Sequence, residues 1–218
     1  VVSQGDELSI WVYGVTEVVI ETVVDSYGNV NIPISGPLQV AGLAFADVKS
    51  LVVSKLQTAY PNSSIIVNIS KYSTIQVSLI GNVNAPGVYN VSALSTVKDL
   101  LIQSGGVKGN GTVRSITLQR QDGSIYVVDL YDLLTNKNIK PAIFLKTGDL
   151  IYIPNAYKII SIAGAVYNPA KFELKRDEKL DQLLEYAGGI TAKGSQHGLK
   201  VEGYYDGQAQ VKTVDASA

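Results

Sequence analysis

The sequence predicts an α+β fold in which short strands outnumber helices. Apolar and polar residues alternate along several short segments, namely 8–13, 65–69, 75–79, 116–118 and 126–128. A period of two is typical of strands that bury one face. Apolar residues at helical spacing occur in only a few stretches. One part of the chain also resembles a later part, which implies two modules of similar fold.

Four helices are predicted, namely 44–59, a helix that begins after Thr96, a helix from Leu180 to Ala187, and a short one from Asp129 to Leu134. Asp99 stands three residues after Thr96, which is a capping-box pattern. The second and third helices each run into a Gly-Gly pair, where a left-handed C-terminal turn suits glycine. Two Asp-Gly pairs, at 122–123 and 206–207, lie between alternating runs and predict β-hairpins.

The two copies of the internal repeat are separated by a constant offset, so that Gly81 of the first copy corresponds to Gly164 of the second. Under this offset the two Gly-Gly pairs coincide, and so do the hairpin turns once one residue is inserted in the second copy. Each copy is predicted to contain strand, turn, strand, helix, Gly-Gly and hairpin. The first copy continues through a short helix and a strand over 149–154, and the second copy lacks equivalents of these.

Composition excludes several classes of function. The 218 residues include 18 Lys and Arg against 19 Asp and Glu, so the net charge of −1 argues against a strongly basic nucleic-acid binder. There is no cysteine and one histidine, His197, which excludes disulfides, thiolate zinc sites and iron–sulfur clusters. No metal site and no cofactor are predicted. No apolar run approaches the length of a membrane-spanning helix.

No catalytic residue is predicted. The carboxylates Asp6, Asp25 and Asp149 are each placed at a turn with a glycine close by, and a turn role is favoured over an acid–base pair for glycoside hydrolysis. Asp129 is interpreted as a helix N-cap. For His197, a solvent-exposed position is favoured over a role as ligand or base.

Four residues are candidates for contacts with substrate or with a neighbouring subunit. Lys71 and Tyr72 lie just ahead of the repeat, while Arg114 and Arg120 lie near the two ends of a predicted strand over 113–119. A subunit interface and a plain surface position are equally favoured for them, and contact with an acidic polysaccharide is less favoured.

Several motifs resemble those of a known family. The segments Gly5–Gly14, Asp25–Pro33 and Gly36–Leu43 resemble three successive motifs of the bacterial polysaccharide export family. The repeat resembles the soluble-ligand-binding β-grasp (SLBB) module. The second copy departs from it at Ala170, where the first has Gly87. The motif positions to which we assign structural roles are Gly5, Asp6, Asp25, Gly28, Pro33, Gly36, Gly42, Gly81, Pro86, Gly87, Gly105, Gly106, Gly148, Asp149, Gly164, Pro169, Gly188 and Gly189.

The resemblance implies a small export domain over 1–74, a first β-grasp module over 75–157 and a second, incomplete one over 158–218. It further suggests that the opening strand, 8–13, pairs within the first β-grasp module rather than within the export domain.

The resemblance also implies a function. Members are periplasmic parts of outer-membrane exporters of capsular polysaccharide or exopolysaccharide in Gram-negative bacteria, and they form stacked rings, usually octamers, around a wide lumen. The partners implied are the polysaccharide, further copies of the chain, an inner-membrane polysaccharide co-polymerase, and the outer membrane through segments absent here. We therefore expect this part of the chain alone to be largely monomeric or weakly associated.

A passive conduit needs weak hydrogen-bonding groups and no reactive centre, because a tightly bound segment would not leave. The alternative is a β-grasp module that binds a glycan or small ligand without a role in transport. An enzyme is the least favoured, because no convergent acid–base pair is visible.

Overall fold

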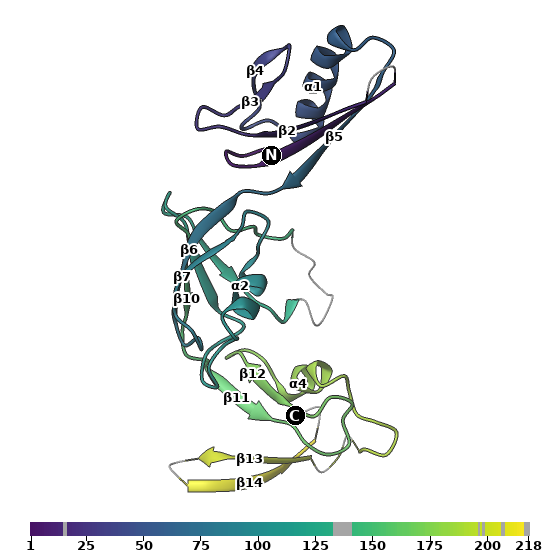
Figure 1. Cartoon of the computed structure of the whole chain (residues 1–218). Coiled ribbons are helices and arrows are strands. Elements are labelled where there is room, and N and C mark those ends of the chain that lie inside the picture. Colours follow the sequence, from purple (N-terminus) through teal and green to yellow (C-terminus); the bar gives the residue numbers. More distant parts are fainter. Residues whose placement is uncertain (15–16, 133–140, 196, 198, 206–207, 216–218) are drawn as a thin grey trace. The chain divides into compact units, whose positions relative to one another are not determined.

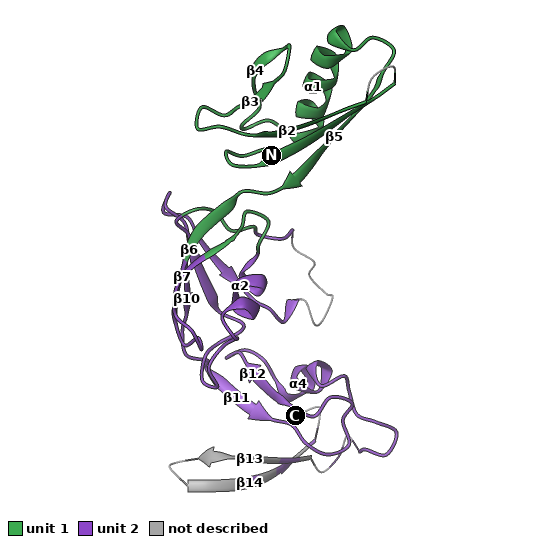
Figure 2. Cartoon of the chain, viewed as in Figure 1, with its two compact units in different colours: residues 1–77, 90–95, 144–147 green, residues 78–89, 96–143, 148–218 purple. Residues whose placement is uncertain are grey.

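The computed structural model describes residues 1–14, 17–132, 141–195, 197, 199–205 and 208–215. The strands and helices confirm the predicted α+β class (Figure 1). The chain divides into two compact units, one of residues 1–77, 90–95 and 144–147, the other of 78–89, 96–143 and 148–218 (Figure 2). No helix of the described residues is long and apolar enough to cross a membrane.

An antiparallel sheet opens the first unit. Its strand order is β2-β1-β5, with β1 at Glu7–Tyr13, β2 at Val18–Val23 and β5 at Ser64–Lys71. Because β1 pairs along its length with both β2 and β5, the expectation that the opening strand joins the first β-grasp module was wrong. The partner that was not predicted is the long strand β5, which lies far from β1 in the sequence.

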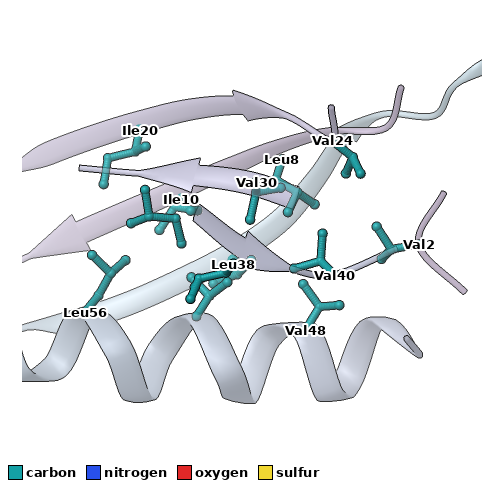
Figure 3. Packing of buried hydrophobic residues seen from close by; sticks show 13 residues of the cluster. Val2, Leu8, Ile10, Ile20, Val24, Val30, Leu38, Val40, Val48 and Leu56 are labelled. Atoms are coloured by element: carbon teal, nitrogen blue, oxygen red, sulfur yellow. The ribbon is translucent and has the colours of Figure 1, made fainter. Parts of the chain in front are cut away.

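The helix α1 (Phe45–Ala59) covers one face of this sheet, as the spacing of its apolar residues predicted. A two-stranded hairpin of β3 (Asn29–Ile32) and β4 (Gly36–Gln39) adds to the same core. Figure 3 shows Val48 and Leu56 of α1 pointing toward the sheet, where Leu8 and Ile10 are fully buried. The alternation of β1 therefore sends its even-numbered residues into the core and its odd-numbered ones to the opposite face.

A five-stranded sheet forms the first β-grasp module, in the order β7-β6-β10-β8-β9. Its strands are β6 (Thr74–Gly81), β7 (Gly87–Ser92), β8 (Ile116–Gln119), β9 (Ile125–Val128) and β10 (Leu150–Ile153). The predicted strand over 149–154 becomes β10, which pairs in parallel with β6 and antiparallel with β8. Leu79, Ile151 and Leu118 form one fully buried row across the three strands.

Helix α2 (Val97–Gln103) begins and ends as predicted. Thr96 and Asp99 form the reciprocal capping box, in which the Thr96 N–H donates to the Asp99 carboxylate over 2.9 Å. At the other end the Gly106 N–H donates to the Leu101 carbonyl over 2.8 Å, and Gly105 has a positive φ of 79°. These are the bonds of a Schellman C-terminus.

The second β-grasp module contains β11 (Lys158–Ser161), β12 (Lys171–Leu174), α4 (Leu180–Tyr186), β13 (Leu199–Tyr205) and β14 (Gln208–Val214). The strands form two antiparallel pairs, β11-β12 and β13-β14. The Asp206-Gly207 turn that was predicted between β13 and β14 lies outside the described residues, as do Leu133 and Leu134 of the predicted short helix.

The offset of the sequence repeat holds in the backbone geometry. Isolated bridges join Val83 to Val107 and, one repeat later, Val166 to Ile190. The end of α4 repeats the end of α2, because the Gly189 N–H donates to the Leu184 carbonyl over 2.8 Å. The predicted internal repeat is therefore a repeat of structure as well as of sequence.

Gly81 shows why the repeat keeps a glycine at its start. Its φ is +95°, and a Cβ atom there would lie 2.3 Å from the carbonyl oxygen of Ile153 on β10. A residue with a side chain would have to push the central parallel strand away. Gly164, its equivalent, has the same φ of +95°, but a Cβ atom there would have no neighbour within 4 Å among the described residues, so the two copies share the backbone conformation and not the close approach.

Candidate functional site

The predicted carboxylates at turns hold the backbone. Asp6 accepts hydrogen bonds from the N–H groups of Ser3 (2.8 Å) and Ser73 (2.7 Å). Asp25 accepts from the N–H groups of Tyr27 (2.8 Å) and Asn29 (2.9 Å) through one oxygen. The contacts with Ser3, Tyr27 and Asn29 are of the local kind by which an Asp side chain stabilises a turn.

Lys71 and Tyr72 lie at the exposed end of β5. The Lys71 Nζ is 2.9 Å from Oε1 of Glu7 on the neighbouring β1. An exposed pair of this kind contributes between about 0 and 1 kcal/mol to stability. Both residues therefore remain accessible for contact with another molecule.

Arg120 belongs to the hairpin between β8 and β9. Its guanidinium lies over the Tyr126 ring at 4.9 Å from the ring centroid, and its Nε is 4.0 Å from the buried carboxylate of Asp149. Within unit 2 it thus links the hairpin to the residue that precedes β10. Arg114, which comes shortly before it in the chain, takes part in a different set of contacts.

Arg114 is buried, with 3% of its surface exposed, so the expectation of a surface position was wrong for this residue. The reason is a dense set of partners from the second β-grasp module. Its Nη2 donates to Glu178 Oε1 (2.6 Å) and to the Tyr186 hydroxyl (3.2 Å). Its Nη1 donates to Glu178 Oε2 and to the backbone carbonyl of Glu173 (3.2 Å). The two-pronged contact with Glu178 is the geometry that guanidinium groups favour.

The first module supplies further groups around Arg114. Asp129 Oδ2 accepts from Arg114 Nη2 at 3.3 Å and from Lys175 Nζ at 2.6 Å. The Tyr131 ring centroid lies 4.4 Å from the Arg114 guanidinium carbon, a cation–π contact. Asp129 also accepts from the Tyr131 N–H over 2.9 Å. Most of the short helix that Asp129 was predicted to cap lies outside the described residues.

Glu173 of the second module makes the remaining contacts of this set with the first module. Its carboxylate accepts from the Thr112 hydroxyl (2.5 Å) and from the Val113 N–H (2.8 Å), and its own N–H donates to the Tyr131 hydroxyl (2.9 Å). We call the whole set the junction cluster. Its members are Thr112, Arg114, Asp129 and Tyr131 of the first β-grasp module and Glu173, Lys175, Glu178 and Tyr186 of the second.

Burial and charge pairing shift the titrations within the junction cluster. Burial lowers the pKa of Arg114, but its hydrogen bonds to Glu178 and Asp129 outweigh this and raise it. Burial raises the pKa of Glu178, yet the hydrogen bonds from Arg114 and the Lys175 N–H bring it below its usual value. Burial and the hydrogen bond to Glu178 raise the pKa of Tyr186 to about 12. Near neutral pH, Arg114 and Glu178 therefore form an ionised pair beside a protonated Tyr186.

The contacts of the junction cluster join the two β-grasp modules around the buried Arg114. Both terminal nitrogens of Arg114, Nη1 and Nη2, donate to groups of the same unit. Tyr131 packs with Phe172, Leu183 and Ala187 in one apolar core. A nucleophile or base needs a free, accessible atom beside its partner. The arrangement instead holds the two β-grasp modules together.

The remaining predicted candidates form no common site. The His197 side chain is exposed, as expected, with Nδ1 3.5 Å from the carboxylate of Asp215. The loop between Gly105 and Gly111 closes onto its own module, since the Lys108 N–H donates to the Asn82 carbonyl over 3.0 Å. Among the residues that the structure describes, no group of three or more acidic or histidine side chains could hold a metal ion.

Sequence reasoning missed the residues of the second module that surround Arg114. Lys175 and Glu178 stand in the run Lys175-Arg176-Asp177-Glu178, which is unusually charged for a chain with only 17% charged residues. That local density was the available signal. It could not reveal the partner, because Arg114 and Glu178 are 64 positions apart.

Comparisons with known families give three matches in order along the chain. Residues 1–70 match the family described as polysaccharide biosynthesis/export protein, residues 75–153 match an SLBB domain, and residues 159–204 match a second SLBB domain.

Two relatives are named for the transport or export of a polysaccharide. The chain is 28% identical over 177 residues to the polysialic acid transport protein KpsD of Escherichia coli, covering 80% of this chain and 32% of the relative. It is 23% identical over 203 residues to the EPS I polysaccharide export outer membrane protein EpsA of Ralstonia solanacearum, covering 90% of this chain and 53% of the relative. The chain thus spans about a third of the first relative and about half of the second.

Proposed function

We propose that the chain, in which a match to the polysaccharide biosynthesis/export family is followed by two matches to SLBB domains, is the periplasmic portion of an outer-membrane polysaccharide exporter. The exporter carries capsular polysaccharide or exopolysaccharide to the surface of a Gram-negative cell. The observation that carries the proposal is the order of the three matched domains, together with two relatives named for polysialic acid transport and for polysaccharide export. The domains of the proposal are 1–74, 75–157 and 158–218.

In this proposal the protein conducts the polymer and catalyses no reaction. The acidic residues Asp6 and Asp25 support this, because backbone N–H groups occupy their carboxylates. The junction cluster also suits a wall segment, since it fixes two modules that would otherwise swing on a linker. Copies of the full-length protein assemble into stacked rings, with an inner-membrane polysaccharide co-polymerase as partner.

The exposed Lys71 and Tyr72 are the proposed contacts of this assembly, either with a neighbouring copy or with the polymer. Arg120, partly exposed beside Tyr126, is a weaker candidate of the same kind. Reversing the charge at Lys71 in the full-length protein would weaken a ring in which it contacts an acidic neighbour.

A deletion strain tests the proposal. We expect loss of surface polymer by capsule staining, accumulation of polymer in the periplasm, and recovery of both when the full-length gene is restored. Native mass spectrometry of the full-length protein is expected to give a closed oligomer. An unchanged capsule in the deletion strain, together with a strictly monomeric full-length protein, would refute the proposed function.

A further inference from the structure

The sheet β2-β1-β5 has a second face, opposite to α1, that carries large apolar side chains. Leu8, Ile10 and Val12 of β1 point into the core, so Trp11 and Tyr13 lie on the opposite side. A sheet with one buried face usually carries polar residues on the other. Here Trp11, the one tryptophan of the chain, is 39% exposed near the middle of the sheet.

Strand register arranges this outer face in rows. Trp11 lies opposite Val19 on β2 and opposite Ile66 on β5, and these two side chains are 50% and 45% exposed. The next row along the strands is polar, because Ser9, which is itself buried, lies between the exposed Glu21 and Asn68. An apolar row therefore runs beside a row of hydroxyl, carboxylate and amide groups. We call these six residues together with Tyr13 the outer face.

The aromatic rings of the outer face form a platform. The ring centroids of Trp11 and Tyr13 are 6.1 Å apart, and the ring planes differ by only 14°. Two residues that are two positions apart on one strand project to the same side. The two nearly parallel rings therefore lie next to each other along the strand direction.

We propose that the outer face binds a short stretch of a pyranose chain, with the sugar C–H groups against Trp11 and Tyr13 and the hydroxyl groups toward Glu21 and Asn68. The electron-rich faces of aromatic rings attract weakly polarised C–H groups. A carboxylate and an amide supply acceptors and donors for hydroxyl groups. This inference rests on the proposed function and gives the exported polymer a contact site on this chain.

The size of the outer face favours a sugar chain over a protein partner. Three strands at about 4.8 Å spacing and six residues at about 3.3 Å rise give a face of about 14 by 20 Å. A stable protein interface buries about 800 Å² on each partner, which is well beyond this area. A few sugar rings laid along the strand would cover it.

The charge of the outer face favours a neutral stretch of polymer. Glu7 on the same face is paired with Lys71, whereas Glu21 adds a carboxylate in the polar row next to Trp11. A carboxylate repels an anionic sugar and accepts hydrogen bonds from hydroxyl groups. Contacts of this kind are weak, as passage of a polymer requires.

Titration of the whole chain with cellotetraose, a neutral β-linked glucose oligomer, tests the inference by NMR. The single indole N–H resonance of Trp11 is expected to shift and saturate, with a Kd of about 1 mM. Tyr13→Ala is expected to weaken binding about three- to tenfold, because one half of the platform is lost. Tyr27→Ala is the matched control, since Tyr27 is 83% exposed in a turn of the same domain, and it is expected to leave the Kd unchanged.

A tetramer of α2,8-linked sialic acid provides the charge test. It is expected to bind more weakly than cellotetraose, and Glu21→Gln is expected to strengthen it relative to the parent chain. Failure of both sugars to shift the Trp11 indole at ten times the expected Kd would overturn the inference. So would shifts that follow protein concentration without sugar, because the outer face would then be a self-association surface.

The two proposals can fail separately. Absent sugar binding with polymer trapped in the deletion strain leaves the export function intact and removes the outer face from it. Sugar binding, with an unchanged capsule in that strain and a strictly monomeric full-length protein, refutes export and leaves a glycan-binding surface.

Discussion

Replacing Arg114 with methionine removes a side chain that contacts both Asp129 and Glu178 at the junction of the β-grasp modules. The flexible apolar chain of methionine fills much of the same volume. Glu178 keeps hydrogen bonds from the Tyr186 hydroxyl (2.8 Å) and the Lys175 N–H (2.9 Å), but it loses its cation. Asp129 keeps the Lys175 Nζ at 2.6 Å. The variant therefore removes the cation beside Glu178 together with the hydrogen bond from Arg114 to the Glu173 carbonyl and the cation–π contact with Tyr131.

The magnitude follows from the burial of the two charged side chains. The Arg114 side chain is 4% exposed and that of Glu178 is 8% exposed, so solvent screens the pair little. Removing one partner of a buried pair destabilises a protein by about 3–5 kcal/mol. Since Glu178 keeps two neutral donors, we expect a value at the lower end, about 3 kcal/mol. For a chain of this size this loss lowers the Tm by about 6–12 °C.

Thermal unfolding followed by circular dichroism measures the loss of stability, and amide hydrogen exchange shows in which part of the chain it occurs. Protection is expected to fall at the junction of the β-grasp modules and to stay unchanged in β1 and β5. Arg176→Met is the control, because Arg176 is exposed on the same segment over the Tyr157 ring, and its Tm is expected to stay within about 2 °C of the parent. A Tm for Arg114→Met that stays within the same limit would refute the assignment of the cluster as the joint.

Three further predictions concern pH and backbone. The lowered pKa of Glu178 means that its contribution to stability is present above its ordinary pKa of 4.5 and is lost as the pH falls below that value. In unfolding measured as a function of pH, Glu178→Gln is expected to reduce the fall in stability at acid pH. The pKa of Tyr186, raised from 10 to about 12, gives stability that is present below pH 10 and lost as the pH rises toward 12; Tyr186→Phe is expected to lower stability at neutral pH and to flatten this alkaline limb. Gly81→Ala is expected to destabilise the first β-grasp module by at least about 2 kcal/mol in urea unfolding. Gly123 has a similar positive φ but open space for a Cβ atom, so Gly123→Ala is expected to lower the free energy of unfolding by about 1 kcal/mol. Equal losses for the two variants would contradict the steric argument.

The local features of the fold could be predicted from the sequence because they depend on neighbouring residues. The capping box of Thr96 and Asp99 and the glycine ends of α2 and α4 are set by side chains within one helical turn. The alternation along β1 is likewise local. The pairing of β1 with β5 was missed, because the two strands are far apart in the sequence and the family resemblance suggested another partner for the opening strand.

The candidate site was less predictable for the same reason. Arg114 was singled out by its place near a strand end, and nothing near it in the sequence indicates burial. Its environment is made by Glu173 and Glu178, which come from the other module. The outer face was also missed, since Trp11 and Tyr13 read as ordinary residues of an alternating strand until β2 and β5 place Val19 and Ile66 beside them.

The two repeat copies form the same turn, but the side chain that follows it has different surroundings in each copy. In the first copy the Thr112 hydroxyl accepts from the Arg114 N–H over 3.0 Å, and at the equivalent positions of the second copy the Ser195 hydroxyl accepts from the His197 N–H over 3.1 Å. The turn is therefore a property of the module. The side chain that the turn projects has opposite surroundings in the two copies, buried among carboxylates at Arg114 and exposed at His197. Repetition of a fold thus keeps the position of this side chain, and only the sequence of the adjoining module decides whether that position becomes a joint.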